Sequence, residues 1–376
     1  MKRFAATMLI GAGLLLGLAR PAAGVPLKEG KPIDVVLCLD VSGSMGGLID
    51  SAKTRLWDIV NELAKVKPTP QLRVSLYSYG HSTYPANNGW VRKEVDLSTD
   101  LDEIYRKLNA LTINGGEEYV ARVSHAALVE QKWSEDPGAL KIVFVCGNEP
   151  ATQDPSIKVD IVAELAKKKG IVVNTIYCSW GHPEEIKGWQ DFALQCKGKF
   201  AIIEHNKQVV QVQTPFDKGM VELNEKLNKT YIAYGRMGYE KAANQLAQDA
   251  NAAKAGAQAN ASRIATKGGE LYKNGEWCVV SRLLENPKFD ITKIPEADLP
   301  EDLKKLKPDE RVALVKKKAE ERAKINKEIS ELSTKRQKYL ETEMKKHASD
   351  ADKALDGALK KILREQAKEK GIEIPE

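Results

Sequence analysis

The chain has 376 residues, with 58 Lys and Arg against 52 Asp and Glu, which leaves a net charge of +6. An excess that small, spread over so many charges, is typical of a solvated surface and does not indicate nucleic-acid binding. The hydrophobic fraction of 42% is ordinary for a globular protein, and the length suits about two domains.

The first residues have the layout of a secretory signal peptide. Lys2 and Arg3 precede an apolar run that ends near Leu18, and small residues follow as far as Gly24. The run is shorter than the about 20 apolar residues that span a bilayer. We therefore expect residues 1–24 to be cleaved, with an uncleaved anchor as the alternative. The mature chain is expected to be exported, periplasmic or secreted, without a stable transmembrane segment.

Residues 30–206 are predicted to form one α/β domain. Short β-rich runs alternate with helical patterns, which indicates a doubly wound, mostly parallel sheet with helices on both faces. A loop rich in Pro, Asn and Gly before residues 90–97 predicts an antiparallel hairpin at the sheet edge. The other strands are expected at 33–40, 71–79, 140–146, 171–178 and 200–204.

The chain has five cysteines, an odd number, and none of them forms a C-x-x-C motif. Export to an oxidising compartment favours one disulfide. Cys178 closes a strand-like run and Cys196 ends the next helical stretch, so we expect their Cα atoms to lie close enough to pair. Cys38 and Cys146 lie in apolar strands and are interpreted as buried small hydrophobic residues.

Beyond residue 206 the chain is rich in Ala, Lys, Glu and Gln, which predicts a helical region over 207–285. Four prolines indicate a linker over 286–308. Residues 309–376 are predicted to form a long helix, partly a coiled coil, and an amphipathic piece near residues 355–363 could fold back on it.

Apolar residues of the long helix are spaced as in a coiled-coil seam. Ile325, Ile329, Leu332 and Tyr339 step by four, three and seven residues, although Arg336 interrupts the pattern. The seam predicts either a homodimer through this helix or an intramolecular helical hairpin.

Candidate chemistry lies where the first strand ends. Asp40, Ser42 and Ser44 place a carboxylate and two hydroxyls at alternate positions on the turn into the next helix. Ligands of open α/β sheets bind at the carboxyl ends of the strands. Hard oxygen donors suit magnesium, whose coordination shell an outside carboxylate can complete. A Ser-rich turn that only caps the helix is the alternative.

These residues resemble the D-x-S-x-S metal-ion-dependent adhesion motif of the von Willebrand factor type A family, over roughly residues 33–204. The resemblance implies that Ser42 and Ser44 bind Mg²⁺ or Mn²⁺ directly and that Asp40 binds it through a water. It also implies a protein or acidic ligand.

Two other elements of the family pattern are altered. Where the family usually has Gly-Gly-Thr, this chain has Gly-Gly followed by Glu117 and Glu118. Where the family usually has Thr-Asp-Gly, the aspartate position is Gly147, and Asn148 or Glu149 could approach the site instead.

These changes alter the position of charge more than its amount, because a gained glutamate replaces the lost aspartate. Glu117 and Glu118 could ligate the ion together with Asn148. The alternative is that both glutamates are solvated at a helix start, where negative charge suits the helix dipole.

Two common enzymatic motifs, the nucleophile elbow and the phosphate-binding loop, are absent from the sequence. The histidines are scattered, and there is no G-x-S-x-G or G-x-x-x-x-G-K-[ST] pattern. We therefore expect a non-catalytic exported protein that binds a protein or acidic ligand through a modified metal site. The alternative is a structural scaffold with a vestigial metal site that acts through its C-terminal helices.

Overall fold

The computed structural model describes residues 30–179, 183–203, 212–347 and 350–375, so the predicted signal peptide lies outside the described residues. Within them, one sheet has the strand order β3-β2-β1-β4-β5-β6. β3 pairs antiparallel with β2, and the other neighbours pair in parallel, which confirms the predicted sheet and its edge hairpin. The strands are β1 (Pro32–Asp40), β2 (Gln71–Tyr79), β3 (Val91–Ser98), β4 (Leu140–Gly147), β5 (Val172–Tyr177) and β6 (Phe200–Ile202).

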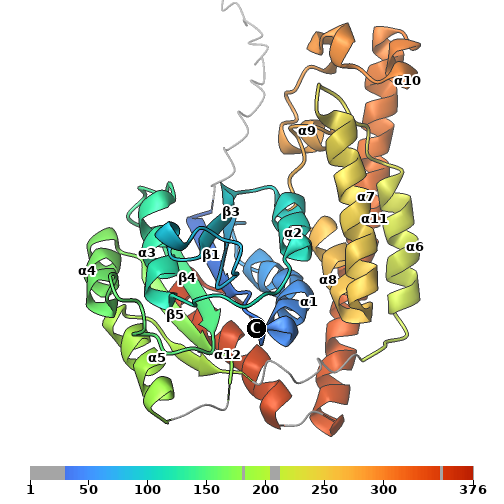
Figure 1. Ribbon diagram of the computed structural model, residues 1–376. Helices are drawn as coiled ribbons and strands as arrows, with labels where there is room; N and C mark the ends of the chain where they lie inside the picture. Colours follow the sequence, from blue (N-terminus) through green and yellow to red (C-terminus); the bar gives the residue numbers. More distant parts are fainter. Residues whose placement is uncertain (1–29, 180–182, 204–211, 348–349, 376) are drawn as a thin grey trace, which may run out of the picture.

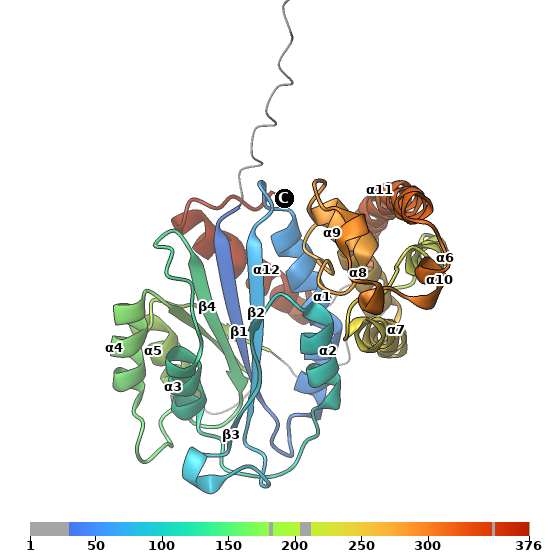
Figure 2. The ribbon, with the colours of Figure 1, turned by 90° about the horizontal axis from the view of Figure 1, so that it is seen from above.

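Helices cover both faces of the sheet (Figure 2). One face packs against α3 (Val120–Glu130), α4 (Val159–Lys169) and α5 (Pro183–Gln195). The other face packs against α1 (Gly46–Ala64), α2 (Leu101–Ala110) and α12 (Asp350–Glu369). With both faces covered, β1 is buried at every residue after Pro32, as expected for a continuous apolar strand inside a parallel sheet.

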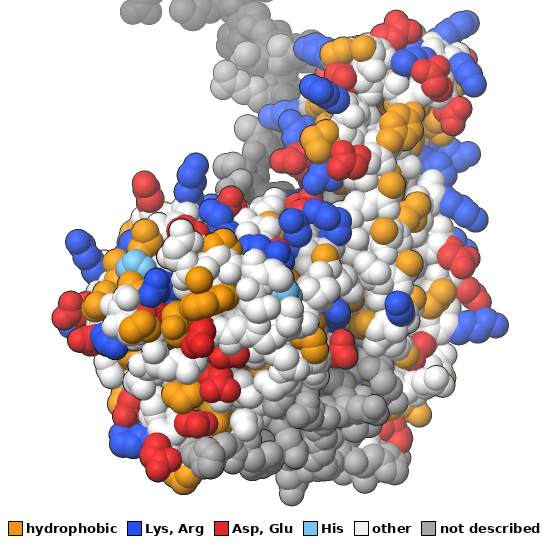
Figure 3. Space-filling model, in the orientation of Figure 1, with side chains coloured by type: hydrophobic (Ala, Val, Ile, Leu, Met, Phe, Trp, Pro, Cys, Tyr) orange, Lys and Arg blue, Asp and Glu red, His pale blue; other side chains and the backbone are white. Residues whose placement is uncertain are grey.

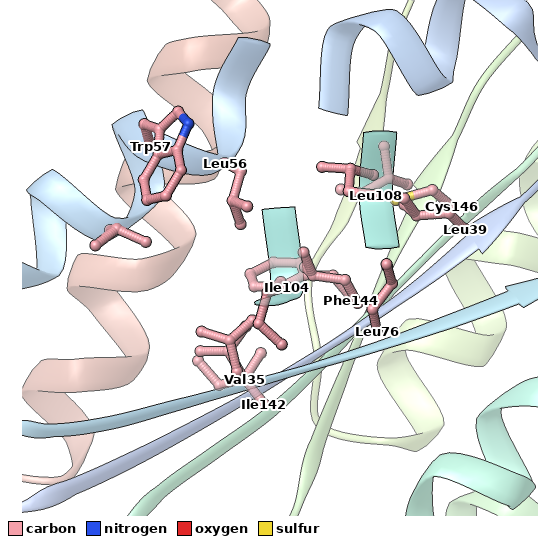
Figure 4. Packing of buried hydrophobic residues seen from close by; sticks show 14 of the residues in the cluster. Val35, Leu39, Leu56, Trp57, Leu76, Ile104, Leu108, Ile142, Phe144 and Cys146 are labelled. Carbon is pink, nitrogen blue, oxygen red and sulfur yellow. The ribbon is translucent and has the colours of Figure 1, made fainter. Parts of the chain in front are cut away.

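The core on the α1 side holds that helix against the central strands. Figure 4 shows Val35 and Phe144 of the sheet close to Leu56 of α1 and Ile104 of α2. Because α1 directly follows β1, this packing fixes the short turn that joins them.

The C-terminal helix α12 belongs to the core of the sheet domain. Ile362 and Leu363 are buried together with residues of β1 and β4. Asn174 of β5 and Gln366 exchange two hydrogen bonds of 3.0 and 2.6 Å in a buried position. The amphipathic C-terminal piece therefore packs on the sheet and not on the long helix. Along the sequence, the helical region is inserted between β6 and this last helix of the sheet domain.

The chain enters and leaves the sheet domain at the same place. The Lys31 Nζ, beside the start of β1, donates hydrogen bonds to the carbonyl oxygens of Lys370 and Gly371. Ile372 is buried in the same core as β1. Figure 2 shows the C-terminus beside the amino end of the central strands.

The helical region stands beside the sheet domain as an elongated bundle (Figure 1). Its longest helix, α11, has 40 residues, so the long helix predicted from residue 309 ends at His347 and a separate helix, α12, follows. No helix among the described residues is both long enough and apolar enough to cross a membrane. The helices are α6 (Asp217–Asn228), α7 (Gly238–Ala255), α8 (Ala257–Lys267), α9 (Val279–Glu285), α10 (Glu301–Lys304) and α11 (Pro308–His347).

The coiled-coil seam of α11 is used inside the chain. Ile325 and Ile329 are buried in a cluster with residues of α6 and α8. The ring of Tyr339 meets that of Phe216 edge-on, and Arg336, which interrupts the seam, forms an ion pair of 2.8 Å with Asp217. The seam therefore packs inside the chain, in a bundle with α6 and α8 and not in the two-helix hairpin that was one of the alternatives.

The Pro-rich segment 286–308 is packed and does not form an extended linker. Ile291, Ile294, Leu299 and Leu303 are buried in one cluster with residues of α9 and α11, including Val315. Its prolines separate short helical turns that close the far end of the bundle.

The predicted disulfide between Cys178 and Cys196 is wrong. All five cysteines are free and buried. Cys178 lies in the core on the α1 side of the sheet, whereas Cys196 lies in the core on the α3 side. The sheet therefore separates the two sulfur atoms, which linear spacing could not reveal.

Buried charges join the helical region to the sheet domain. Arg263 of α8 bonds to Asp102 of α2 and to Asp249 of α7, both at 2.7 Å. Lys267 adds a second cation at 2.7 Å from Asp249. Burial opposes ionisation of Asp249, but the charges of Lys267 and Arg263 outweigh it and lower its pKa to about 2.

Candidate metal site at the carboxyl edge of the sheet

The candidate site lies on the turn between β1 and α1. The turn is fixed by two neighbouring segments, because the Val41 N–H donates to the Tyr79 carbonyl at 2.9 Å and the Asn114 N–H donates to the Val41 carbonyl at 3.0 Å. The carboxyl ends of β1, β2 and β4 meet at this edge, which lies at the bottom of Figure 2 and faces the viewer in Figure 3. The fold therefore brings the predicted loops together.

Asp40 is the most deeply buried carboxylate of the site. Its Oδ1 accepts a 2.8 Å hydrogen bond from the Ser42 N–H. Its Oδ2 is also buried and has no hydrogen-bond partner. Burial raises the pKa of Asp40 to about 7, more than the hydrogen bonds from Ser42 lower it, and the charge of Glu149 adds to the rise. An unpartnered buried oxygen is costly and points to a missing partner.

The two serines and Asn148 lie next to one another at this edge. Ser42 is buried and Ser44 is exposed. The Asn148 Nδ2 donates to the Ser44 Oγ at 3.2 Å, while the Asn148 Oδ1 is buried without a partner. Asn148 therefore reaches the serine turn and presents a second unpartnered oxygen.

The two glutamates of the second loop differ in their surroundings. Glu117 is exposed, whereas Glu118 is half-buried. A Cβ placed on Gly80 would lie 2.9 Å from the Glu118 Cγ and 3.0 Å from the Asp40 Oδ1, so only this glycine separates the two side chains. Burial, followed by the charges of Asp40 and Glu149, raises the pKa of Glu118 to about 7. The structure brings Glu118 to the site and leaves Glu117 at its rim.

A tyrosine that sequence reasoning missed fills the space beside Gly147. A Cβ on Gly147 would lie 2.3 Å from the Tyr79 Oη and 3.0 Å from the Asp40 Oδ2. The Tyr79 hydroxyl donates to the Cys146 carbonyl at 2.9 Å. Burial raises the pKa of Tyr79 well above its usual value, so the phenol is neutral. A neutral hydroxyl thus stands where the family pattern has a charged side chain.

Acidic side chains gather around the site. Burial raises the pKa of Glu149, and the charges of Glu185 and Glu117 add to the rise. Neither Asp40 nor any of these glutamates forms an ion pair within the described part of the chain. Figure 3 shows acidic side chains grouped on the visible face of the sheet domain.

The donor set fits a hard divalent cation. In the described ranges, no cluster of three or more His, Cys, Asp or Glu is placed to hold a metal ion. An ion at this edge would therefore depend on hydroxyl and amide oxygens as well as carboxylates. The unpartnered Asp40 Oδ2 and Asn148 Oδ1, beside Ser42, Ser44 and Glu118, supply oxygens of the kind that Mg²⁺ binds.

Comparison with solved structures gives partial matches of low sequence identity. Proximal thread matrix protein 1 of the mussel byssus, with a zinc-occupied MIDAS motif, is 16% identical over 47% of this chain and 43% of that chain, with a TM-score of 0.37. The SpRpn10 VWA domain is 16% identical over 47% of this chain and 90% of that chain, with a TM-score of 0.36. The pilus adhesin SpaC of Lactobacillus rhamnosus GG is 15% identical over 47% of this chain and 28% of that chain, with a TM-score of 0.35.

The chain spans less than half the length of the mussel protein. No curated protein matches the sequence. The family model for the von Willebrand factor type A domain matches residues 34–191. This segment holds β1 from its third residue, β2 to β5 in full, and every residue of the candidate site. Residues 34–191 of this chain are therefore a von Willebrand factor type A domain, a kind of domain that is mostly a non-catalytic adhesion or interaction module.

Proposed function

We propose that the chain is an exported, non-catalytic binding protein that holds an acidic group of a protein ligand through Mg²⁺ or Mn²⁺ at the carboxyl edge of its sheet. The observation that carries the proposal is that two buried oxygens of the site, the Asp40 Oδ2 and the Asn148 Oδ1, have no hydrogen-bond partner. A bound cation would satisfy the Asn148 Oδ1 directly and the Asp40 Oδ2 through a water, and it would offset the charge of the nearby glutamates.

Ser42, Ser44, Glu118 and Asn148 are the proposed direct ligands, and Asp40 would bind through a water, as the family resemblance implies. When bound, the ion would supply an open coordination position for a carboxylate of the ligand. Glu117, at the exposed rim, would bias the approach of that ligand through its charge and would not ligate.

With Glu118 as a ligand, the site would neutralise a different share of the charge of the ion than it would with a hydroxyl ligand. A carboxylate neutralises more of the charge of the ion than the threonine hydroxyl of the family pattern does. The cation would therefore attract an outside carboxylate less strongly, while the neutral Tyr79 beside Gly147 partly restores that attraction. We infer a ligand that binds through one acidic group plus contacts with the surrounding loops.

The second candidate function is a scaffold whose metal site is vestigial. It is favoured by one observation: Gly147 stands where the family has a ligating aspartate, and Tyr79 fills the space that a side chain there would need. Under this alternative the helical region is the binding surface.

Titration calorimetry of Mg²⁺ and Mn²⁺ into the chelator-stripped mature chain, paired with thermal-shift measurements, separates the two functions. We expect saturable binding in the wild type, none in Asp40→Asn, and weakened binding in Glu118→Gln. Glu117→Gln is the matched control and should bind like the wild type. Absence of both heat and thermal shift in a folded wild-type protein would reject the metal site and leave the scaffold function.

A further inference from the structure

Helix α7 carries an exposed apolar face with coiled-coil spacing. Tyr239, Ala243, Leu246, Ala250 and Ala253 are exposed and step by four, three, four and three residues. This is the period at which two helices pack along a continuous seam. Two of these residues are large, and Tyr239 is 66% and Leu246 53% exposed.

The opposite side of α7 already has its partners. Gln245, Gln248 and Ala252 are buried, and the helix packs against α8, α2 and α1. Figures 1 and 2 place α7 on the outside of the helical region. Met237, just before the helix, is also 52% exposed. The corresponding seam of α11 is buried within the chain, which leaves this one unpartnered among the described residues.

Charged residues near the two ends of this apolar face indicate that a second copy of α7 would cover it. Glu240 and Lys254 are exposed, and each lies seven residues from Ala247 on the same line along the helix. An antiparallel copy centred on Ala247 would set Glu240 of each helix beside Lys254 of the other. A parallel copy would set like charges together, which is unfavourable.

We propose that α7 is a homodimer contact in which two copies of the chain pair antiparallel about a two-fold axis near Ala247. The pairing is self-complementary in both shape and charge, as a two-fold interface requires. The three alanines of the seam let the helix axes approach closely, because interaxial distance follows side-chain size. Since a single helix contributes the seam, the dimer should be weak and dependent on concentration.

Sedimentation velocity of the mature chain, over about two orders of magnitude in concentration, tests this contact. We expect a reversible monomer–dimer equilibrium in the wild type and only monomer in Leu246→Glu. Leu194→Glu is the matched control, because Leu194 on α5 is 75% exposed and lies away from α7. This control should dimerise like the wild type.

A charge exchange tests the antiparallel direction separately. Lys254→Glu alone should weaken the dimer by about tenfold or more, which is the size of the repulsion expected when a pair of opposite charges becomes a pair of like charges at each end. Adding Glu240→Lys should restore it. A wild type that stays monomeric at every concentration, or a dimer unaffected by Leu246→Glu, would overturn the contact. Failure of the double variant to recover would overturn the antiparallel arrangement.

Discussion

The hydroxyl of Tyr79 shows how a single atom can change the chemistry of a site. It lies where a side chain at position 147 would extend, and it is held there by its hydrogen bond to the Cys146 carbonyl. Because the phenol is neutral, the space beside the Asp40 Oδ2 is filled without another negative charge. Because Gly147 has no side chain, the Tyr79 hydroxyl can occupy the space beside it.

This pairing predicts a strong coupling in stability. Gly147→Ala should lower the free energy of unfolding by about 1–3 kcal/mol, because the new methyl group overlaps the Tyr79 hydroxyl. Tyr79→Phe should cost about 1 kcal/mol through its lost hydrogen bond. The double variant should cost less than the two single changes together, as measured by urea unfolding.

Gly188→Ala provides the control for this cycle, since a Cβ there meets no atom within 4 Å and the residue lies inside α5. It should stabilise by about 0.5–1 kcal/mol through helix propensity. Simple additivity of Gly147→Ala and Tyr79→Phe would contradict the proposed overlap.

The sequence predicted only those residues of the candidate site that lie close together along the chain. Asp40, Ser42 and Ser44 lie within five residues at the end of one strand, so the sequence pattern alone predicts where they lie. The choice of Glu118 over Glu117 depends on which side of a loop faces the sheet edge. The contact of Tyr79 with Gly147 depends on two strands that flank β1, and no spacing along the chain encodes that register.

At the scale of elements, amphipathic patterns predicted helices but not their partners. The apolar positions of α12 indicated a buried face, and the structure shows that the burying surface is the sheet. The seam of α11 likewise indicated a helix contact, and the contact is with α6 and α8. Several apolar surfaces in one chain offer equivalent burial, so only the three-dimensional path decides among them.

The place of α12 predicts that the sheet domain depends on the last residues of the chain. Leu363→Ala should lower the free energy of unfolding by about 2–5 kcal/mol, because Leu363 is fully buried in the core of the sheet domain. Thermal and urea unfolding measure this loss. The neighbouring exposed variant Lys361→Ala should change stability by less than about 0.5 kcal/mol.

A chain that ends at residue 347 should fail to form a stable sheet domain. A truncated protein with the unfolding midpoint of the full chain would show that α12 is dispensable and would contradict this placement.

At the scale of the whole molecule, buried charges lock the two regions together. The guanidinium of Arg263 lies between Asp102 of the sheet domain and Asp249 of the helical region. Its charge matters to both regions, because removal would leave the buried Asp102 without a cation and Asp249 with Lys267 alone. Buried ion pairs of this kind resist hinge motion between the sheet domain and the helical region, and they favour unfolding of both regions as one unit.

Arg263→Met should therefore lower the free energy of unfolding by about 3–5 kcal/mol. It should also split one urea transition into two, which circular dichroism and tryptophan fluorescence would report at different midpoints. The control is Lys241→Met, which removes the half-exposed ion pair with Asp100 at the rim of the same interface. It should cost less than about 1 kcal/mol and leave one transition. Coincident transitions in Arg263→Met would show that the charge network does not join the regions.

The contact between Lys31 and the carbonyl groups of Lys370 and Gly371 determines which way the candidate site would face if the protein were attached by one of its ends. It places both attachment points of the described chain at the amino edge of the sheet, one strand length from Asp40. With nine residues in β1, that length is about 30 Å. A surface, bead or fused carrier joined at either end would therefore hold the molecule by its base, with the acidic edge directed outward toward an approaching ligand.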